Sequence, residues 1–218
     1  SETAYIPFEA ASLDSTCRKA CFSYFQVSTN GMGAATDKLT ALNHAIMELL
    51  ERKRFHDWCL LNETERSKSV IDLSACSSVK LKKLIRQTQK AGFNLIVWNI
   101  SGEGELPVVY CELRKQGAEG GRYSGSCAAP DIEQAVIGAI LEGAQARVAL
   151  ISGSRDDIFE SYYQKNTKLA LSIPEPQVSL EQLKKPLRVD SQLALNQQLV
   201  DILNSEFEDV LLLDLTHK

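Results

Sequence analysis

Two stretches of the chain decide its fold: Gly31–Lys53, GMGAATDKLTALNHAIMELLERK, and Gly125–Arg147, GSCAAPDIEQAVIGAILEGAQAR. We call them the first unit and the second unit. They align without a gap at a constant offset of 94 residues (125 minus 31). The identical pairs are Gly31/Gly125, Ala34/Ala128, Ala35/Ala129, Asp37/Asp131, Ala41/Ala135, Ala45/Ala139, Ile46/Ile140 and Glu48/Glu142. Two unrelated alanine-rich helices would not readily share the glycine, the aspartate and the glutamate together, so the alignment indicates an internal repeat.

Each unit predicts the same local structure. A short strand, at 23–28 or around 122–124, runs into a turn that contains Gly31 or Gly125. An aspartate then caps a helix with apolar residues at helical spacing, because its oxygen accepts from unpaired N–H groups. Further elements follow downstream: helices over Leu81–Gly92 and Leu193–Phe207, and strands over Asn94–Ser101, Glu105–Leu113 and Val210–Thr216.

The resulting prediction is an α+β (mixed α/β) protein with mixed sheets. We expect a single domain over 1–218 that holds two repeats, 23–113 and 122–218. Their two helices should be related by an approximate two-fold axis. The first repeat continues through Glu105–Leu113, and a counterpart of that strand would follow Lys218, so we expect the domain to lack segments at its ends. An unpaired strand edge would then favour homo-oligomers. Ser172–Pro186, with its prolines, is predicted to be a surface connection.

Composition narrows the class of protein. The 218 residues are 44% hydrophobic and 24% charged, with a net charge of −4, which is typical of a globular protein. We expect no nucleic-acid partner, because no strongly basic field is present, and no membrane span, because no apolar run reaches about 20 residues. Six dispersed cysteines are read as reduced and mostly buried, in a cytoplasmic protein without a zinc site. The run Glu51–Arg54 is read as a solvated helix end.

The carboxylates of the two helices are the candidate site. Glu48 and Glu51 in the first unit, and Glu142 and Gln145 in the second, are three residues apart and so share one helix face. Two such faces brought together would form a group of hard oxygen ligands that suits Mg²⁺ on nucleotide phosphates. Spacing alone leaves a second interpretation open, in which these are solvated helix faces.

Three ordered motifs and a turn resemble the YcaO family. His44–Arg52 (HAIMELLER) is similar to the pattern SxxxExxER, and Gly138–Gln145 (GAILEGAQ) to QxxxExxQ. Arg155–Phe159 matches RxxxF, and Ser28–Ala35 (STNGMGAA) resembles the family's turn before the first helix. Each motif is weak alone, whereas the ordered set over about residues 23–160 is specific, and a weaker similarity extends to Lys218.

The resemblance implies ATP-dependent activation of peptide backbone amides. An attacked amide oxygen would take the γ-phosphoryl group of ATP, and loss of phosphate would give an azoline, a thioamide or an amidine. It implies the cofactors ATP and Mg²⁺, with phosphates or nucleotide bound by Ser28, Asn30, Glu48, Glu51, Glu142, Gln145 and Arg155, and Mg²⁺ by Glu48, Glu51, Glu142 and Gln145. Its implied partners are a precursor peptide or protein and a leader-presenting accessory protein, such as a relative of ubiquitin-activating enzymes. No catalytic residue is assigned.

Two positions depart from the family pattern. His44 stands at the usual serine, where it would either pack or contact the ligand, and Gly138 stands at the usual glutamine. These departures leave an alternative function open: a non-catalytic interaction or scaffold domain that keeps the fold and has lost nucleotide binding. Trp58 and Trp98 are predicted to pack in the core, and His56 and His217 to lie on the surface.

Overall fold

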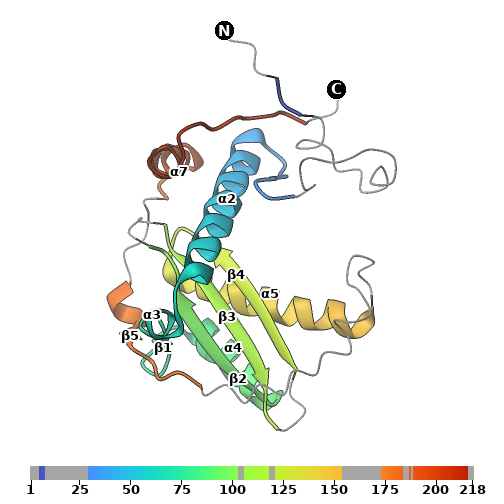
Figure 1. The fold of residues 1–218 in the computed structure, drawn as a ribbon, viewed down its shortest axis with the longest axis vertical. Helices are drawn as coiled ribbons and strands as arrows, with labels where there is room; N and C mark the ends of the chain where they lie inside the picture. The colour runs from blue at the N-terminus through green and yellow to red at the C-terminus, as the bar shows by residue number, and fades with distance from the viewer. Residues whose placement is uncertain are drawn as a thin grey trace.

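The structure is a computed structural model, and it describes residues 5–7, 29–102, 106–117, 121–153, 173–183, 187 and 189–215. Within these ranges the chain forms helices and both parallel and antiparallel sheets, which confirms the predicted α+β class (Figure 1). The helices are α2 (Lys38–Leu60), α3 (Glu63–Ser67), α4 (Val79–Lys90), α5 (Ile132–Ser152), the 3₁₀ turn η2 (Leu180–Leu183) and α7 (Gln192–Glu206). The strands are β1 (Ile71–Asp72), β2 (Phe93–Asn99), β3 (Val108–Lys115), β4 (Arg122–Ala128) and β5 (Val178–Ser179).

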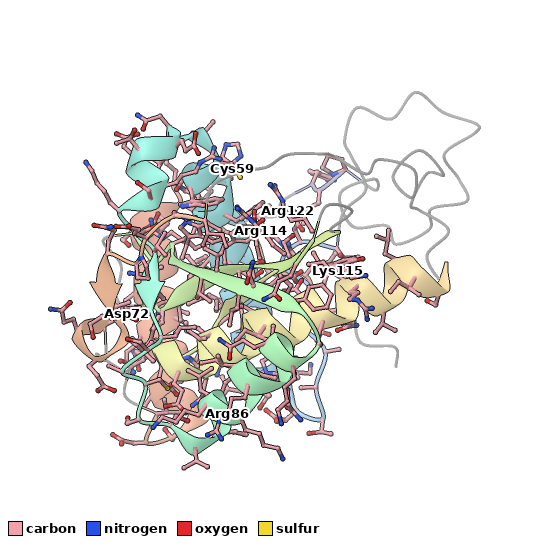
Figure 2. The ribbon with its side chains drawn as sticks, turned by 90° about the horizontal axis from the view of Figure 1, so that it is seen from below. Cys59, Asp72, Arg86, Arg114, Lys115 and Arg122 are labelled. Carbon is pink, nitrogen blue, oxygen red and sulfur yellow. The ribbon has the colours of Figure 1, made fainter. Side chains whose placement is uncertain are left out.

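The main sheet has the order β2-β3-β4, and both pairings are antiparallel. A second, two-stranded sheet pairs β1 with β5 in parallel. The central strand β3 is buried from Val108 to Leu113, because helices cover both of its faces. Helix α5 lies along one face on β3 and β4, and α2 crosses the other face at β4 (Figure 1). Seen from below, Arg86 of α4 lies on the α5 side, and Arg114 and Arg122 lie on the α2 side (Figure 2).

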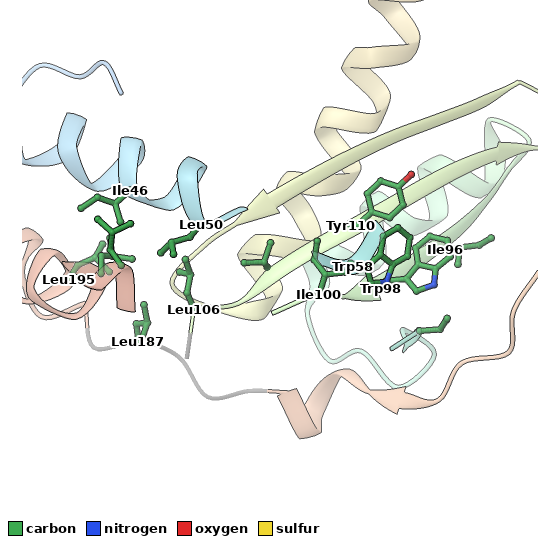
Figure 3. Close-up of a cluster of buried hydrophobic side chains, with 14 residues drawn as sticks. Ile46, Leu50, Trp58, Ile96, Trp98, Ile100, Leu106, Tyr110, Leu187 and Leu195 are labelled. Carbon is green, nitrogen blue, oxygen red and sulfur yellow. The ribbon is translucent and has the colours of Figure 1, made fainter. Parts of the chain in front are cut away.

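Successive residues of β3 alternate between two apolar clusters, as the two faces of a strand require. Val108 and Tyr110 belong to the cluster on the α2 side, and Val109 and Cys111 to the cluster on the α5 side. The α2-side cluster (Figure 3) also contains both tryptophans, which confirms their predicted core packing. Its other members come from α2, the neighbourhood of β2 and α7, namely Ile46, Leu50, Val70, Ile96, Ile100, Leu106, Leu187, Leu195, Leu199 and Leu203.

Elements of the two predicted repeats are interleaved in the fold. β4, at the start of the second repeat, completes the sheet that holds β2 and β3 of the first. Helix α7 of the second repeat packs on α2, whereas α4 of the first packs on β2 and α5. This interleaving joins parts of the chain that are far apart in sequence: buried Asn43 donates to the backbone and side-chain oxygens of Gln192 and accepts from Asn196 (2.8–3.0 Å).

Three expectations about segments are wrong. The segment 210–215 is exposed coil and not a strand, while Thr216 and the expected strand 23–28 lie outside the described residues. The stretch Ser172–Pro186 is more than a surface connection, since it contributes β5, η2 and the buried Leu180. Residues 51–54 lie in the interior of α2, and Arg54 pairs with Glu206 there.

Helix α5 is long and apolar enough to cross a membrane by length and composition alone. It carries two glutamates and an arginine, and one of its faces packs on β3 and β4. The side chains buried on that face include Val136, Ala139 and Ile140. The helix therefore has the contacts of a core helix.

Candidate functional site

Both long helices begin in the same way. Asp37 caps α2 with backbone angles of −132° and 153°, and Asp131 caps α5 with −133° and 153°. Each aspartate accepts a 2.9 Å hydrogen bond from the backbone N–H three residues later. This local geometry sets the phase of each helix and therefore the direction in which Glu48 and Glu142, three turns further on, project.

Glu48 and Glu142 make the same hydrogen bond in their two units. The backbone N–H of Met32 donates to Glu48 Oε2 (3.1 Å), and that of Ser126 donates to Glu142 Oε2 (2.8 Å). Met32 and Ser126 are equivalent at the offset of 94. In each unit the carboxylate is thus held against the backbone that precedes its helix, and its second oxygen remains available for other contacts.

Glu51 and Gln145 differ although they align. Glu51 is buried and accepts from Ser126 Oγ (2.6 Å) and from the backbone N–H of Ala128 (3.1 Å), so both of its oxygens bind β4. Gln145 is exposed on α5, and its side chain makes no hydrogen bond to the described residues. Glu51 therefore attaches α2 to β4 and brings the first helix against the strand that leads to the second.

Three carboxylates and one guanidinium lie close enough to influence one another. Burial raises the pKa of Glu142, and the neighbouring carboxylates of Glu51 and Glu48 raise it further, against the opposing effects of the Ser126 N–H and Arg52. Arg52 lies 3.8 Å from Glu48, and its buried Nε has no hydrogen-bond partner among the described residues. We call Glu48, Glu51, Arg52 and Glu142 the carboxylate cluster; its formal charge is −2.

The cluster fits Mg²⁺ bound together with phosphates. Among the described residues, no three acidic, histidine or cysteine side chains close around a metal-sized space. Mg²⁺ usually keeps several waters and takes only one or two carboxylates beside substrate phosphates, so a closed cage is not needed. Glu142 Oε1, which no described residue hydrogen-bonds, and the excess of negative charge are the features that suit the cation.

The other predicted site residues are placed less fully. Asn30 is exposed in the turn that leads to Met32, whereas Ser28 and Arg155 lie outside the described residues. Sequence reasoning did not include Ser126 or Met32, whose backbone N–H groups hold the glutamates. The alignment of the two units could have indicated both residues, since each stands 16 residues before its glutamate.

Steric crowding explains why position 138 holds a glycine. A Cβ placed there would lie 2.3 Å from Cys127 Sγ, so the thiol occupies the space of a side chain. Burial and the carboxylates of Glu51 and Glu142 raise the pKa of Cys127 to about 12, which keeps the thiol protonated. His44, the equivalent of Gly138 in the first unit, is exposed.

The described cysteines only partly follow the prediction. All four are free thiols; Cys76 and Cys111 are buried, Cys127 is half-buried and Cys59 is exposed. Cys17 and Cys21 lie outside the described residues, as does His217, while His56 is exposed as predicted.

Comparisons with known proteins identify the family. The profile of the family described as "YcaO cyclodehydratase, ATP- and Mg2+-binding" matches residues 1–218, and the chain belongs to this family. A protein from Rhizobium leguminosarum bv. trifolii, known as "Uncharacterized protein in tfuA 3'region", is 28% identical over 151 residues, which are 65% of this chain and 35% of that protein. An uncharacterized protein from Methanothermobacter thermautotrophicus is 25% identical over 215 residues, 91% of this chain and 54% of the relative.

Solved structures show the same fold. The YcaO protein from Methanopyrus kandleri, solved with AMPPCP and Mg²⁺, has a TM-score of 0.65 at 20% identity and covers 84% of this chain and 49% of that one. The heterocyclase TruD has a TM-score of 0.63 at 19% identity and covers 84% of this chain and 26% of its own. This chain spans about half, or less, of the length of these relatives.

Proposed function

We propose that this chain carries the Mg²⁺–ATP site of an enzyme that activates peptide backbone amides. The observation that carries the proposal is the carboxylate cluster, in which α2 and α5 each hold one glutamate by the same hydrogen bond beside Glu51 and Arg52. Two preoriented carboxylates with an excess of negative charge suit a cation that bridges phosphates. ATP and Mg²⁺ are also the cofactors in the family's description.

In the proposed reaction a nucleophile forms a bond to the carbonyl carbon of a peptide and loses its proton. The carbonyl electron pair moves to the amide oxygen, which takes the γ-phosphoryl group while ADP departs. Phosphate then leaves with that oxygen as the C–O bond breaks, and the carbon forms a double bond either to a nitrogen, which loses its proton, or to the sulfur of an added sulfide, which loses its remaining proton. Phosphorylation is needed because the amide oxygen is otherwise a very poor leaving group. The product is an azoline, a thioamide or an amidine, according to whether the nucleophile is a neighbouring side chain, sulfide or an amine.

In this scheme the residues of the chain position Mg²⁺ and the phosphates and neutralise the phosphate charge. Bound Mg²⁺ would draw the phosphates together and offset their charge. Glu48 and Glu142 would hold it, Gln145 and Asn30 could add further contacts, and Glu51 fixes α2 beside β4. Arg52, and Arg155 of the RxxxF motif, offset phosphate charge, while Ser28 contacts nucleotide.

A precursor peptide or protein is the proposed substrate. A leader-presenting accessory protein, such as a relative of ubiquitin-activating enzymes, would deliver it, and the proposed setting is the cytoplasm. Among the relatives by structure, one heterocyclase is described "in complex with substrate and Cofactor", and the E. coli microcin synthetase McbBCD is described as a complex "with pro-MccB17 bound".

A second candidate function is a scaffold domain that does not bind nucleotide. Two observations favour it: both oxygens of Glu51 already bind β4, and Cys127 fills the space of the polar side chain expected at Gly138. Retention of both equivalent glutamates in the same geometry favours the enzyme.

Calorimetry with ATP and Mg²⁺ on the whole protein separates the two functions. We expect the wild type to bind, and Glu48→Gln or Glu142→Gln to bind at least about tenfold more weakly, since each removes a charged ligand. Glu133→Gln, on the same helix as Glu142 but outside the cluster, is the matched control and should bind like the wild type. Wild-type affinity in both cluster variants would contradict the site, and absence of binding in the wild type would favour the scaffold.

A further inference from the structure

A second polar group lies on the sheet face that α2 crosses, where Glu51 of the carboxylate cluster contacts Ser126. The register pairs Tyr110 with Ser126, Glu112 with Ser124 and Arg114 with Arg122. Alternate residues of a strand share a face, so all six side chains lie on the face where Ser126 contacts Glu51 of α2. Figure 2 shows Arg114 and Arg122 next to each other on this side of the sheet.

Glu112 fixes the two arginines. Its side chain is buried, with the residue 4% exposed, and accepts from Arg114 Nε (2.8 Å) and from the Tyr110 hydroxyl (3.2 Å). Arg122 Nε lies 3.4 Å from Glu112 Oε1, the oxygen that also accepts from Tyr110. Because a buried carboxylate must be paired, these contacts hold both guanidinium groups in place.

Arg122 is the group that can accept a ligand. Its side chain is 51% exposed, and its terminal nitrogens hydrogen-bond no described residue. Arg66, the other arginine nearby, is already used: its guanidinium lies over the Trp58 ring at 4.8 Å and donates to the backbone carbonyls of Trp58 and Cys59. A half-exposed guanidinium held at one edge presents a planar pair of donors that suits a carboxylate.

A cavity of about 590 Å³ opens beside these arginines. We call it the sheet-face cavity. Its lining comes from β3 and β4, from Trp58 and Trp98, from α3, and from Pro174, Glu175 and Gln177. The buried Nε1 of Trp58 has no hydrogen-bond partner among the described residues. Two indole rings and Pro174 supply the apolar part of the lining, and the other nine residues are polar or charged.

We propose that the sheet-face cavity binds a peptide segment through an aspartate or glutamate side chain, with the carboxylate on Arg122 and the adjoining atoms against the tryptophans. The cavity's lining charges select among anions: three arginines face three glutamates, Glu63, Glu112 and Glu175. This balance suits a single carboxylate and disfavours a doubly charged phosphate. Peptide binding here does not depend on ATP; only its identification with the substrate rests on the proposed function.

The position of the cavity predicts where that acidic residue lies in a substrate. Arg122 stands four residues before Ser126 on β4, a separation of about 13 Å along the strand. An extended peptide spans this distance with about four residues. An acidic residue about four positions from the modified amide would therefore reach Arg122 while that amide lies at the carboxylate cluster.

Tryptophan fluorescence tests the proposal directly, because Trp58 and Trp98 are the two tryptophans of the whole chain and both line the cavity. The whole protein, without ATP, is titrated with a short glycine–serine peptide that carries one glutamate, with its glutamine counterpart and with inorganic phosphate. We expect a saturable change with the glutamate peptide, affinity about tenfold weaker for the glutamine peptide, and no saturation by phosphate.

Variants locate the site. Arg122→Ala should bind the glutamate peptide about tenfold more weakly and lose the preference over glutamine, and Arg122→Lys should keep part of it. Lys115→Ala, an exposed cation on β3 outside the cavity, is the matched control and should bind like the wild type. Equal affinity for the two peptides, unchanged binding in a folded Arg122→Ala variant, or tighter binding of phosphate would overturn the proposal. Such a result with intact ATP binding would leave the proposed function standing, and Glu142→Gln should retain the peptide signal.

Discussion

The first and second units share a backbone plan and differ in how they use their side chains. Both place an aspartate cap and, three turns later, a glutamate held by the N–H of an equivalent residue. The units differ at the next aligned position: both carboxylate oxygens of Glu51 accept hydrogen bonds from β4, whereas its equivalent Gln145 is exposed. The features that both units share position one glutamate on each helix. The difference between Glu51 and Gln145 means that only α2 is also attached to β4 through a side chain.

Even the shared glycine serves two purposes. Gly31 lies in a turn with a φ of +77°, a conformation that suits glycine. Gly125 lies inside β4, not in the predicted turn, and a Cβ there would come within 2.4 Å of the Ala139 carbonyl oxygen on α5. The same residue thus allows a left-handed turn in one unit and close strand–helix packing in the other.

The largest expected effect tests what the units share. Glu48→Gln and Glu142→Gln should each lower ATP turnover with a peptide substrate by about 10²–10³, because each removes a preoriented charge from the phosphate site. The melting temperature should barely change, since glutamine keeps the size and helix propensity. A loss confined to one variant would show that the two glutamates are not equivalent in use.

The next largest effect tests whether Cys127 leaves room for a side chain at position 138. Gly138→Ala should destabilise the fold by about 1–3 kcal/mol through overlap with Cys127, although alanine is otherwise the better helix former. Adding Cys127→Gly, which copies Gly33 of the first unit, should restore most of the loss. The measurement is urea unfolding.

Gly143→Ala on the same helix is the control for that series. An added Cβ there meets its nearest neighbour, Leu113, at 3.4 Å, an ordinary contact. This variant should be neutral or stabilised by up to about 1 kcal/mol. Equal destabilisation by the two alanines would remove the steric account of Gly138.

The attachment of α2 to β4 gives a third, asymmetric effect. Glu51→Gln should cost about 1–3 kcal/mol, because an amide NH₂ would face the Ser126 or Ala128 donor and leave a buried group unpaired. The equivalent change in the second unit, Gln145→Ala, should stay within about 0.5 kcal/mol. Denaturant midpoints of the two variants test this difference, and equal costs would contradict it.

The smallest effect depends on pH. Because the pKa of Glu142 is raised in the folded state, the favourable contribution of this group is present below the unfolded pKa and is lost as pH rises through the folded pKa. Glu142→Gln avoids that loss, so its stability relative to the wild type should increase with pH across this window. Melts with Mg²⁺ should abolish the gain, and a gain of equal size at every pH would argue against repulsion among the carboxylates.

Local signals in the sequence predicted the two helix starts and a strand over Glu105–Leu113, where β3 lies, because caps and strand-forming residues act within a few residues. The strand at Val210–Thr216 failed since apolar composition does not supply a hydrogen-bonding neighbour, and the described part of this segment pairs with no strand. The two-residue strands β1 and β5 have no periodicity to detect. The bonds from Glu51 to β4 cross 75 and 77 residues, so no local pattern could reveal them.

The packing of α2 on α7 has a consequence for the nascent chain. Asn43 and its partner Gln192 are 149 residues apart, and Ile46 and Leu50 on the same helix share a core with Leu195. At ordinary translation rates that separation takes roughly ten to thirty seconds to synthesise. For that time the ribosome carries a finished α2 whose apolar side chains have no α7 to cover them.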